Sequence, residues 1–364
     1  MIETAVRPAC HKLLHDMFQL KKGETLAITC DSETDMTVVT ATAEMAKEMG
    51  AFPLILKNKA PDASGKAGER QMPVEALVKA IRASDAWIEY NNKWLYCSSV
   101  YDRIVEEEQP RPRYMNLCGA TGEVLARNLG GMDLALMKRF VDAMTDYCQR
   151  GKHFLITSPS GTYLECDNAP DRLYFSANGA VARGGMTMFP GQISWSPDYA
   201  SMNGTIVLDG SVYPLPGVLE NPIRLTVERG YVVVERGYVV AAEGEGSEAA
   251  KYAEWLNSYS DPNMHLVGHV SMGFGPRAVL SGNVIEDERV WGCTEWGFGN
   301  VVPNLVSDIP GGIPAETHAD GICLKCSVWI DGIRILDNGT VVGPTAEIAA
   351  WAEQLRQSCA AEAD

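Results

Sequence analysis

The feature that most constrains the fold is a regular alternation of strand-like and helix-like segments over the first 150 residues. Short apolar runs of strand length occupy residues 24–30, 53–57, 86–90 and 114–118. Residues 35–49, 73–81 and 133–149 carry helical spacing, with Gly50 after the first of these segments and Pro73 at the start of the second. Such alternation is typical of a parallel sheet with helices on its faces. The sequence therefore predicts an N-terminal α/β domain over residues 1–150.

The pattern changes after residue 150, where short strands follow one another with Gly, Pro and Asn turns between them. We expect strands at residues 153–157, 162–166, 173–176, 204–208 and 223–227, and helices at 247–257 and 345–361. Residues 227–233 (VERGYVV) recur as 234–240, and because each Glu-Arg-Gly suits a tight turn, we predict a small meander there. The predicted fold class is thus α/β plus α+β, with a β-rich C-terminal domain over residues 151–364.

The charge balance limits the partners of the chain. It has 31 basic and 47 acidic residues, so its net charge is −16 at pH 7. A chain this acidic repels nucleic-acid phosphates and anionic membranes. No run approaches the roughly 20 apolar residues that span a bilayer. Because the first residues lack an apolar signal core, we expect a cytoplasmic protein that binds neither nucleic acid nor membrane.

Ten cysteines are dispersed through the chain, which in a cytoplasmic protein indicates reduced, mostly buried thiols. Cys323 and Cys326 form the only close pair. We predict one strand over residues 321–330, in which positions three apart face opposite sides. A zinc site would also need a second pair at suitable spacing, and the sequence has none. Neither redox nor zinc chemistry is therefore expected at this pair.

His318 is the most informative of the six histidines, because Asp320 follows it two residues later. On an extended segment these two side chains share one side, so together they offer a nitrogen and an oxygen ligand to a metal ion. His269, from another predicted strand, would complete a set of two histidines and one carboxylate. That set is associated with non-haem Fe(II) oxygenases. By itself His-x-Asp is a weak motif, and a purely structural pair is the alternative.

The segments around these residues resemble a known family, the aminopeptidase T group of metallopeptidases. The resemblance covers the metal-binding half of that group and lies in residues 189–192 (FPGQ), 203–209 (NGTIVLD), 269–273 (HVSMG), 295–299 (EWGFG) and 318–320 (HAD). It implies a site for two metal ions whose ligands come from five places. His318 and Asp320 keep the family's residue types. Gln192 stands in place of a ligand Glu, His269 in place of the bridging Glu, and Glu295 in place of a ligand His.

A His in place of the bridging Glu, beside His-x-Asp, is the pattern of one branch of this superfamily, the 2,5-dihydroxypyridine 5,6-dioxygenases. The chain resembles that branch in residues 208–209 (LD), 261–262 (DP), 269–270 (HV), 276–278 (PRA) and 318–320 (HAD). The resemblance implies one Fe(II), with Mn or Zn as alternatives, bound by His269, His318 and Asp320. It also implies cleavage of a small hydroxylated aromatic or N-heteroaromatic ring with O₂, and a homodimer or higher oligomer. An extradiol-type dioxygenase with one metal ion is therefore the leading hypothesis.

Metal-dependent hydrolysis is the second hypothesis. A further relative, 5-nitroanthranilate aminohydrolase, adds water to an aromatic ring without O₂. Glu295 would suit such an aminohydrolase, or an aminopeptidase, as the general base beside a metal-activated water. The alternative role for Glu295 is a hydrogen bond that orients a ligand histidine. A third hypothesis is a binding protein that keeps the scaffold without the activity.

The predicted substrate contacts are aromatic, thioether and polar side chains close to the motif segments: Trp94, Tyr96, Met188, Gln192, Arg277 and Trp296. A rough alignment places residues 94–96 and Met188 where the dioxygenase branch has histidines that contact the substrate. Aromatic and thioether side chains suit a flat, conjugated ring. Arg277 would either bind a carboxylate of the substrate or pair with a structural Asp.

Overall fold

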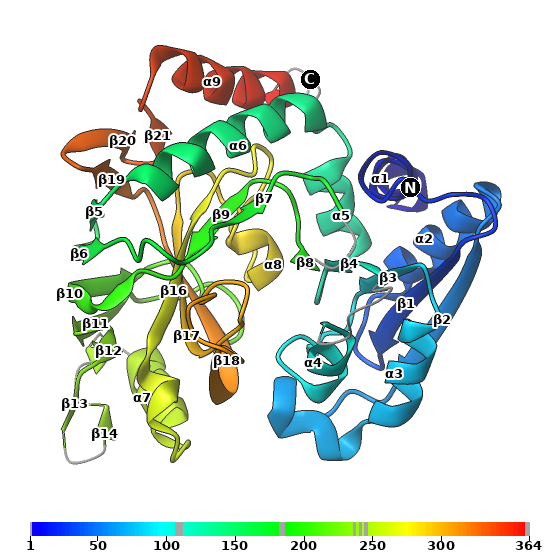
Figure 1. Cartoon of the computed structure of the whole chain (residues 1–364), viewed down its shortest axis with the longest axis horizontal. Coiled ribbons are helices and arrows are strands. Elements are labelled where there is room, and N and C mark those ends of the chain that lie inside the picture. Colours follow the sequence, from blue (N-terminus) through cyan, green and yellow to red (C-terminus); the bar gives the residue numbers. More distant parts are fainter. Residues whose placement is uncertain are drawn as a thin grey trace. The chain divides into compact units, whose positions relative to one another are not determined.

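The computed structural model describes residues 2–105, 112–181, 186–235, 238–239, 242–243 and 247–360 (Figure 1). The chain forms two compact units. Unit 1 consists of Met1–Leu134 and Gly179–Pro190, and unit 2 of Ala135–Asn178 and Gly191–Asp364. The chain thus returns to unit 1 for one short segment before it completes unit 2. The predicted domain boundary at residue 150 stays a prediction.

Unit 1 is built on a five-stranded parallel sheet. The strand order is β2 (Phe52–Asn58), β1 (Thr25–Asp31), β3 (Ala86–Glu89), β4 (Arg113–Asn116) and β8 (Met186–Thr187). The inner strands β3 and β4 are buried along their whole length, as is typical of parallel strands with helices on both faces. The four apolar runs of the N-terminal half coincide with β1 to β4, so the predicted α/β class is confirmed.

The helices of unit 1 follow the signals in the sequence. They are α1 (Ile2–His11), the π-helical segment η1 (Lys12–Met17), α2 (Met36–Glu48), the 3₁₀ segment η2 (Gly65–Gln71), α3 (Val74–Arg82), α4 (Ser99–Val105) and α5 (Gly122–Leu129). Helix α2 begins where the carboxylate of Asp35 accepts a hydrogen bond from the backbone N–H of Thr37. It ends just before Gly50, whose φ of +78° suits glycine. The predicted helices at 35–49 and 73–81 are confirmed.

Unit 2 contains a nine-stranded antiparallel sheet. Its main order is β12 (Tyr231–Val232), β11 (Ile223–Glu228), β10 (Asp198–Leu208), β6 (Tyr163–Asp167), β5 (His153–Thr157), β19 (Ser327–Ile330), β20 (Ile333–Asp337) and β21 (Thr340–Val341), and β15 (Ala242–Glu243) also pairs with β11. These strands confirm the β-rich character that the short, turn-separated runs predict.

The repeated VERGYVV segments form hairpins at one end of this sheet. Strands β11 and β12 are joined by a tight turn at Arg229 and Gly230, whose φ values are +50° and +84°. The tight turn predicted for the first repeat is therefore confirmed. Strand β13 (Val234–Glu235) pairs with β14 (Tyr238–Val239), and the second predicted turn lies outside the described residues.

A second antiparallel sheet of unit 2 has five strands. Its order is β18 (Ile313–Cys323), β17 (Thr294–Val301), β16 (Val267–Gly273), β9 (Gln192–Trp195) and β7 (Phe175–Ala177). The register pairs His269 with Gly297 and Gly297 with Asp320, so β17 lies between the strands that carry the predicted metal ligands.

Alternation along these strands gives the five-stranded sheet one apolar and one polar face. Apolar side chains such as Val270 and Trp296 share one face. The opposite face, which we call the polar face, carries Gln192, Ser194, His269, Ser271, Glu295, Gly297, His318 and Asp320. Most of these polar side chains are buried, and Glu295 and Ser271 have no exposed surface. Because buried polar groups are costly unless they find partners, the polar face is where chemistry is expected.

The helices of unit 2 are α6 (Leu134–Arg150), α7 (Ser247–Asn257), the 3₁₀ segment η3 (Pro262–His265), α8 (Val284–Asp287) and α9 (Ala346–Ala360). They confirm the helices predicted at 133–149, 247–257 and 345–361. Among the helices of the described residues, none is long and apolar enough to cross a membrane.

The single strand predicted over residues 321–330 is wrong. Strand β18 ends at Cys323, the chain turns through Lys325 with φ of +50°, and β19 begins at Ser327. The apolar run hid this break, because a positive φ at a lysine leaves no signal in hydrophobicity. Cys323 and Cys326 are both buried, and the nine cysteines described by the structure are free thiols.

Candidate metal centre

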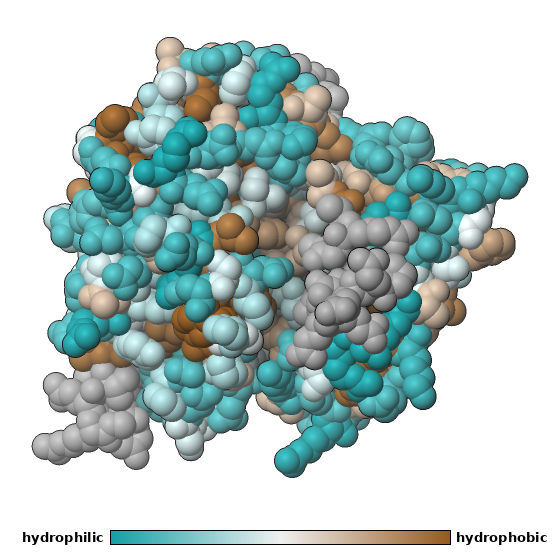
Figure 2. Space-filling view, in the orientation of Figure 1, coloured by the Kyte–Doolittle hydropathy of each residue, from teal (hydrophilic) through white to brown (hydrophobic). Residues whose placement is uncertain are grey.

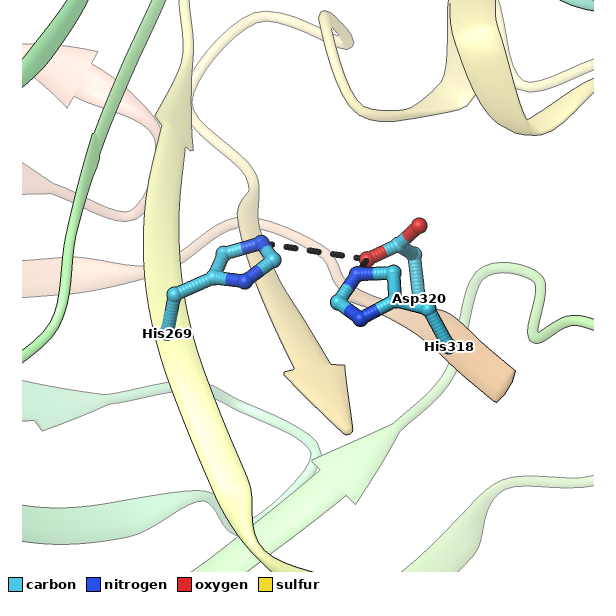
Figure 3. A group of neighbouring side chains, drawn as sticks. All are labelled: His269, His318 and Asp320. Atoms are coloured by element: carbon cyan, nitrogen blue, oxygen red, sulfur yellow. Dashed lines mark hydrogen bonds and ion pairs between the residues drawn. The ribbon is translucent and has the colours of Figure 1, made fainter. Parts of the chain in front are cut away.

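Three side chains converge on the polar face of the five-stranded sheet. His269 comes from β16, and His318 and Asp320 come from β18 (Figure 3). His318 Nε2 lies 2.9 Å from Asp320 Oδ1, and His269 Nε2 lies 3.8 Å from the same oxygen. The two imidazole rings stack with their centres 5.2 Å apart. Because one ligand atom from each residue lies within 4.8 Å of the others, the three residues could share one metal ion.

Gly297 is the reason that His269 can reach Asp320 across the intervening strand. A Cβ atom at Gly297 would lie 2.0 Å from Cε1 of His269 and 2.3 Å from its Nδ1. Real carbon contacts do not become this short, so the imidazole ring occupies the space that a side chain on β17 would fill. The glycine of the EWGFG segment is therefore a structural requirement of the centre.

The hydrogen bonds of His318 indicate that this centre suits a cation. Its Nδ1 lies 2.8 Å from the carbonyl oxygen of Asn300, and because a carbonyl only accepts, Nδ1 carries the proton. In a neutral ring, Nε2 then presents a lone pair to Asp320 Oδ1. Two acceptors that face each other need a proton or a cation between them. Two imidazole nitrogens and one carboxylate oxygen are ligands suited to Fe, Mn or Zn, so these residues fit a divalent metal ion.

The two histidines of the centre have opposite protonation tendencies. Burial and the neighbouring positive charge of His318 lower the pKa of His269 to about 4. Burial also lowers the pKa of His318, but the carboxylate of Asp320, together with Glu295 and the Asn300 carbonyl, outweighs it and raises this pKa to about 9. His269 is thus ready to act as a neutral ligand, and a metal ion would take the position of the proton on His318.

Glu295 lies beside the three residues on the same face. Its carboxylate oxygens lie 3.1 and 3.2 Å from His269 Nε2. The hydroxyl of Ser271 donates a hydrogen bond to Oε2, and Ser194 Oγ lies 2.7 Å from Ser271 Oγ. Burial and the negative charge of Glu288 raise the pKa of Glu295 to about 7, whereas a side-chain hydrogen bond with Asp320 lowers this pKa and opposes the effect of burial. The carboxyl group is therefore suited to exchange a proton near neutral pH.

A buried charge network adjoins the centre. Arg289 has no exposed surface, and its guanidinium donates hydrogen bonds to Glu288 and, at 2.7 Å, to Gln192 Oε1. The amide nitrogen of Gln192 donates to Glu288 Oε2 at 3.1 Å. Burial raises the pKa of Glu288, whereas Arg289 opposes this shift. Arg289 thus provides a fixed positive charge among three buried carboxylates, those of Glu288, Glu295 and Asp320.

The structure places the other predicted site residues of unit 2 as follows. Gln192 is buried on the polar face, with its amide held by Glu288 and Arg289. Trp296 is fully buried on the opposite, apolar face, and its indole N–H donates to Thr294 Oγ1 at 3.1 Å. Arg277 is half-buried in the segment between β16 and α8. Trp296 thus has the position of a core residue, and the substrate contacts of these three residues stay predictions.

The remaining predicted substrate contacts belong to unit 1. Trp94 and Tyr96 follow β3, Met188 follows β8, and all three are half-buried. They lie beyond the carboxyl ends of parallel strands, which is where open α/β sheets bind their ligands. The backbone N–H of Tyr96 and that of Leu95 point at the buried carboxylate of Glu89. Contact of Trp94, Tyr96 and Met188 with a substrate stays a prediction.

The sequence hid several residues of the centre. Glu288 and Arg289 lie in the charged run 286–289, which looks like a solvated turn in the sequence, although the structure buries all four residues. Gly297 and Ser271 lie inside the motif segments, but their roles depend on strand register. Asn300 contributes through its backbone carbonyl, for which the sequence gives no signal.

Comparisons with known proteins identify relatives of the whole chain. A family model for 2,5-dihydroxypyridine 5,6-dioxygenase (NicX) matches residues 8–343. The 2,5-dihydroxypyridine 5,6-dioxygenase of Pseudomonas putida (strain KT2440) is 26% identical over 156 residues, which are 41% of this chain and 42% of that protein. In that alignment, the chain thus spans less than half the length of the curated relative.

Two solved structures share the fold. The 2,5-dihydroxypyridine dioxygenase from Pseudomonas putida KT2440 has a TM-score of 0.75 at 18% identity, over 94% of this chain and 98% of that one. AmpT, an aminopeptidase T from Thermus thermophilus, has a TM-score of 0.67 at 16% identity, over 94% of this chain and 100% of that one. At such identities these likenesses show the fold alone. Because the family model covers nearly the whole chain, the protein belongs to the 2,5-dihydroxypyridine 5,6-dioxygenase family.

Proposed function

We propose that this protein is a ring-cleaving dioxygenase of the extradiol type that uses one Fe(II) ion and acts on a small hydroxylated aromatic or N-heteroaromatic compound. The observation that carries the proposal is the convergence of His269, His318 and Asp320 on a buried polar sheet face. Family membership supports a small aromatic substrate and O₂ as reactants. A cytoplasmic location is part of the proposal and follows from composition alone.

The three residues His269, His318 and Asp320 would hold the ion. A ferrous ion bound there supplies the redox chemistry that lets O₂ react with an aromatic ring, which a redox-inert Zn²⁺ does not supply. The guanidinium of Arg289 favours one dication rather than two at this centre. A second cation near Gln192 would meet the guanidinium at short range.

The chain's own groups would orient the ligands and hold a proton. The Asn300 carbonyl fixes the tautomer of His318, and the hydrogen bond from Ser271 fixes the carboxylate of Glu295. Glu295, which lies beside His269 and accepts the hydrogen bond from Ser271, would hold the ligand histidine in its orientation. In this role Glu295 supports catalysis without activating a water, so Glu295→Gln should lower the turnover only moderately.

Substrate affinity would come from the predicted contact residues. Trp94, Tyr96 and Met188 present aromatic and thioether surface beyond the carboxyl ends of the unit 1 strands. Arg277 would bind an acidic substituent of the ring. We infer that their contribution is to affinity, so Trp94→Ala should raise KM more than it lowers kcat.

Metal content and oxygen uptake test the proposal together. Protein purified without a tag should bind close to one equivalent of iron, and His318→Ala should lose most of it. With a panel of dihydroxylated pyridines and benzenes, an oxygen electrode should record one O₂ per ring cleaved. Two equivalents of metal in the wild type, or unchanged content in His318→Ala, would refute the single-ion site.

Metal-dependent hydrolysis is the second candidate, and the position of Glu295 favours it. A buried carboxyl group with a pKa of about 7, 3.1 Å from a ligand histidine, also suits a general base for water. If hydrolysis is the reaction, turnover should continue under strict anaerobiosis, tolerate Mn²⁺ or Zn²⁺, and collapse in Glu295→Gln. The same substrate panel in an anaerobic cuvette separates the two functions.

A further inference from the structure

A cavity of about 490 Å³ lies in unit 2 between the β11–β12 hairpin and the segment that leads from α7 to η3. The hairpin contributes Glu228 and Tyr231 to its lining, and the segment contributes Tyr259, Asp261 and His265. Among the described residues that line this cavity, none belongs to the candidate metal centre. Its volume lies in the usual range for small-molecule sites.

Backbone hydrogen bonds hold the two walls of the cavity together. The N–H of Val267 donates to the carbonyl of Gly230 at 2.7 Å, and Tyr231 forms an antiparallel bridge with Leu266. Figure 1 draws the hairpin beside α7, the helix that precedes the second wall. Main-chain pairing therefore fixes the position of one wall against the other.

Strand register places an acidic and an aromatic side chain together on the first wall. β11 and β12 pair Glu228 with Tyr231, so the two side chains lie opposite each other on one face of the hairpin. Both residues are exposed, and Tyr231 keeps 40% of its surface open. A ligand in the cavity can thus reach a carboxylate and an aromatic ring on the same wall.

The second wall repeats this combination. The carboxylate of Asp261 accepts a hydrogen bond from the backbone N–H of Asn263 at 2.9 Å, which fixes it at the start of η3. The ring of Trp255 packs edge-on against the ring of Tyr259, with their centres 5.4 Å apart, and so fixes the orientation of Tyr259. Each wall therefore presents one carboxylate and one tyrosine ring.

His265 adds a buried hydrogen-bond acceptor to the lining. The residue is 8% exposed, and its Nε2 has no hydrogen-bond partner within the described residues. Burial lowers the pKa of His265, and a hydrogen bond with the backbone of Pro262 opposes this shift. Because a proline backbone offers only a carbonyl, Nδ1 carries the proton and Nε2 has a lone pair. The ring thus adds no positive charge, and its unpaired acceptor favours a ligand that donates hydrogen bonds.

We propose that this cavity binds a small organic ammonium ion. Two carboxylates line it, and no Lys or Arg is found among its described lining residues. A cation over the face of a tyrosine ring is attracted by the electrons of the ring. The N–H groups of an ammonium ion would also donate hydrogen bonds to the carboxylates. An anion would be repelled, and a neutral alcohol would gain no attraction between charges.

The charge of the whole chain supports a cationic ligand. A net charge of −16 draws small cations toward the protein. The face drawn in Figure 2 is mainly hydrophilic, and its apolar residues lie in small groups. The cavity is thus suited to a charged small molecule, whose binding should weaken as salt screens the attraction. This inference does not depend on the proposed function.

Calorimetry with matched probes tests the charge of the ligand. Hexylamine, n-hexanol and hexanoate share one apolar chain and differ in charge, and hexylamine is protonated at neutral pH. Hexylamine should bind the whole chain at least about tenfold more tightly than the other two probes, and rising salt should weaken its binding. No binding of hexylamine at millimolar concentrations, or equal affinities for hexylamine and n-hexanol, would overturn the proposal.

Substitutions of exposed residues locate the site without a risk to folding. Glu228→Gln should weaken the binding of hexylamine about two- to fivefold, as expected for the loss of an exposed charge. Its matched control is Glu165→Gln, an exposed carboxylate on β6 of the same sheet, which should keep the wild-type affinity. Tyr231→Leu should weaken binding by a similar factor, because the aromatic ring is lost.

His318→Ala separates this site from the metal centre, because an amine can also bind a metal ion. This variant should bind hexylamine with the wild-type affinity. Loss of binding in His318→Ala would place the amine at the metal centre and overturn the proposal. Wild-type affinity in either Glu228→Gln or Tyr231→Leu would overturn it as well.

Discussion

Arg289→Leu is the substitution that tests the buried charge network most directly. Arg289 is fully buried, and its guanidinium bonds Glu288 and Gln192. Leucine keeps an apolar side chain of intermediate size but leaves the carboxylate of Glu288 buried beside Gln192 without its cation. Removing one partner of a buried ion pair is far more costly than removing both, because the remaining charge is not solvated.

The magnitude follows from the burial of both partners. Loss of one member of a buried pair costs about 3–5 kcal/mol of unfolding free energy. At about 2.1 cal/mol/K per residue, a chain of 364 residues has an unfolding entropy near 0.8 kcal/mol/K. Arg289→Leu should therefore lower the Tm by about 4–6 °C. Adding Glu288→Gln should recover part of this loss, because a neutral amide can still accept the hydrogen bond from Gln192.

The assay is calorimetry of metal-free protein, which separates the charge pair from metal binding. The matched control is Arg334→Leu, because Arg334 is 46% exposed and its pair with Asp337 at 3.0 Å faces solvent. An exposed pair contributes about 1 kcal/mol or less. If Arg289→Leu shifts the Tm no more than this control, or if Glu288→Gln makes the variant less stable still, the network is not a buried ion pair and the reasoning is refuted.

Three other substitutions test separate parts of the structure. Gly297→Ala should abolish most metal binding, since its Cβ would collide with the ring of His269; elemental analysis that finds wild-type content would contradict this role. Burial raises the pKa of Glu89 in unit 1, so its contribution to the free energy of unfolding should fall as pH rises from about 4.3. Glu89→Gln should therefore make the free energy of unfolding, measured with denaturant, depend less on pH between pH 4 and 7. A variant with the same pH dependence as the wild type would contradict this role. Gly230→Ala should lower the Tm more than Gly217→Ala. Both glycines have positive φ, but only at Gly230 would an added Cβ collide with a neighbour, Cβ of Tyr199 at 2.8 Å. Equal decreases in Tm would show that backbone strain alone, and not this collision, destabilises the Gly230 variant.

The fold was predictable where local signals and tertiary packing agree. The run at 24–30 is mostly apolar because β1 is buried between its neighbours, and the helix at 35–49 has both an Asp N-cap and a C-terminal glycine. The segment 321–330 was not predictable, because its apolar residues continue through a turn at Lys325. Hydrophobicity reports burial, and a short turn between buried residues looks like the continuation of a buried strand.

The site was predictable to the extent that one strand supplies it. His318 and Asp320 share a face by spacing alone, and His269 was proposed because it completes a set of two histidines and one carboxylate, which the family resemblance also implies. The roles of Gly297 and Arg289 depend on which residues lie opposite one another in the folded sheet, and spacing along one strand does not contain that information. The charge pattern at 286–289 even favours exposure, whereas the structure buries these residues.

The two faces of the five-stranded sheet explain how one fold can hold different metal chemistries. Gln192, His269 and Glu295 all lie on the polar face, and each is followed by an apolar-face residue such as Ile193, Val270 or Trp296. A change of residue type on the polar face alters the charge and the donor set without touching the apolar packing behind it. The resemblance seen in the sequence implies that the aminopeptidase T group carries an acid or a histidine at these three positions. Substitutions on the polar face can therefore change how many cations bind there while the packed core of the fold stays the same.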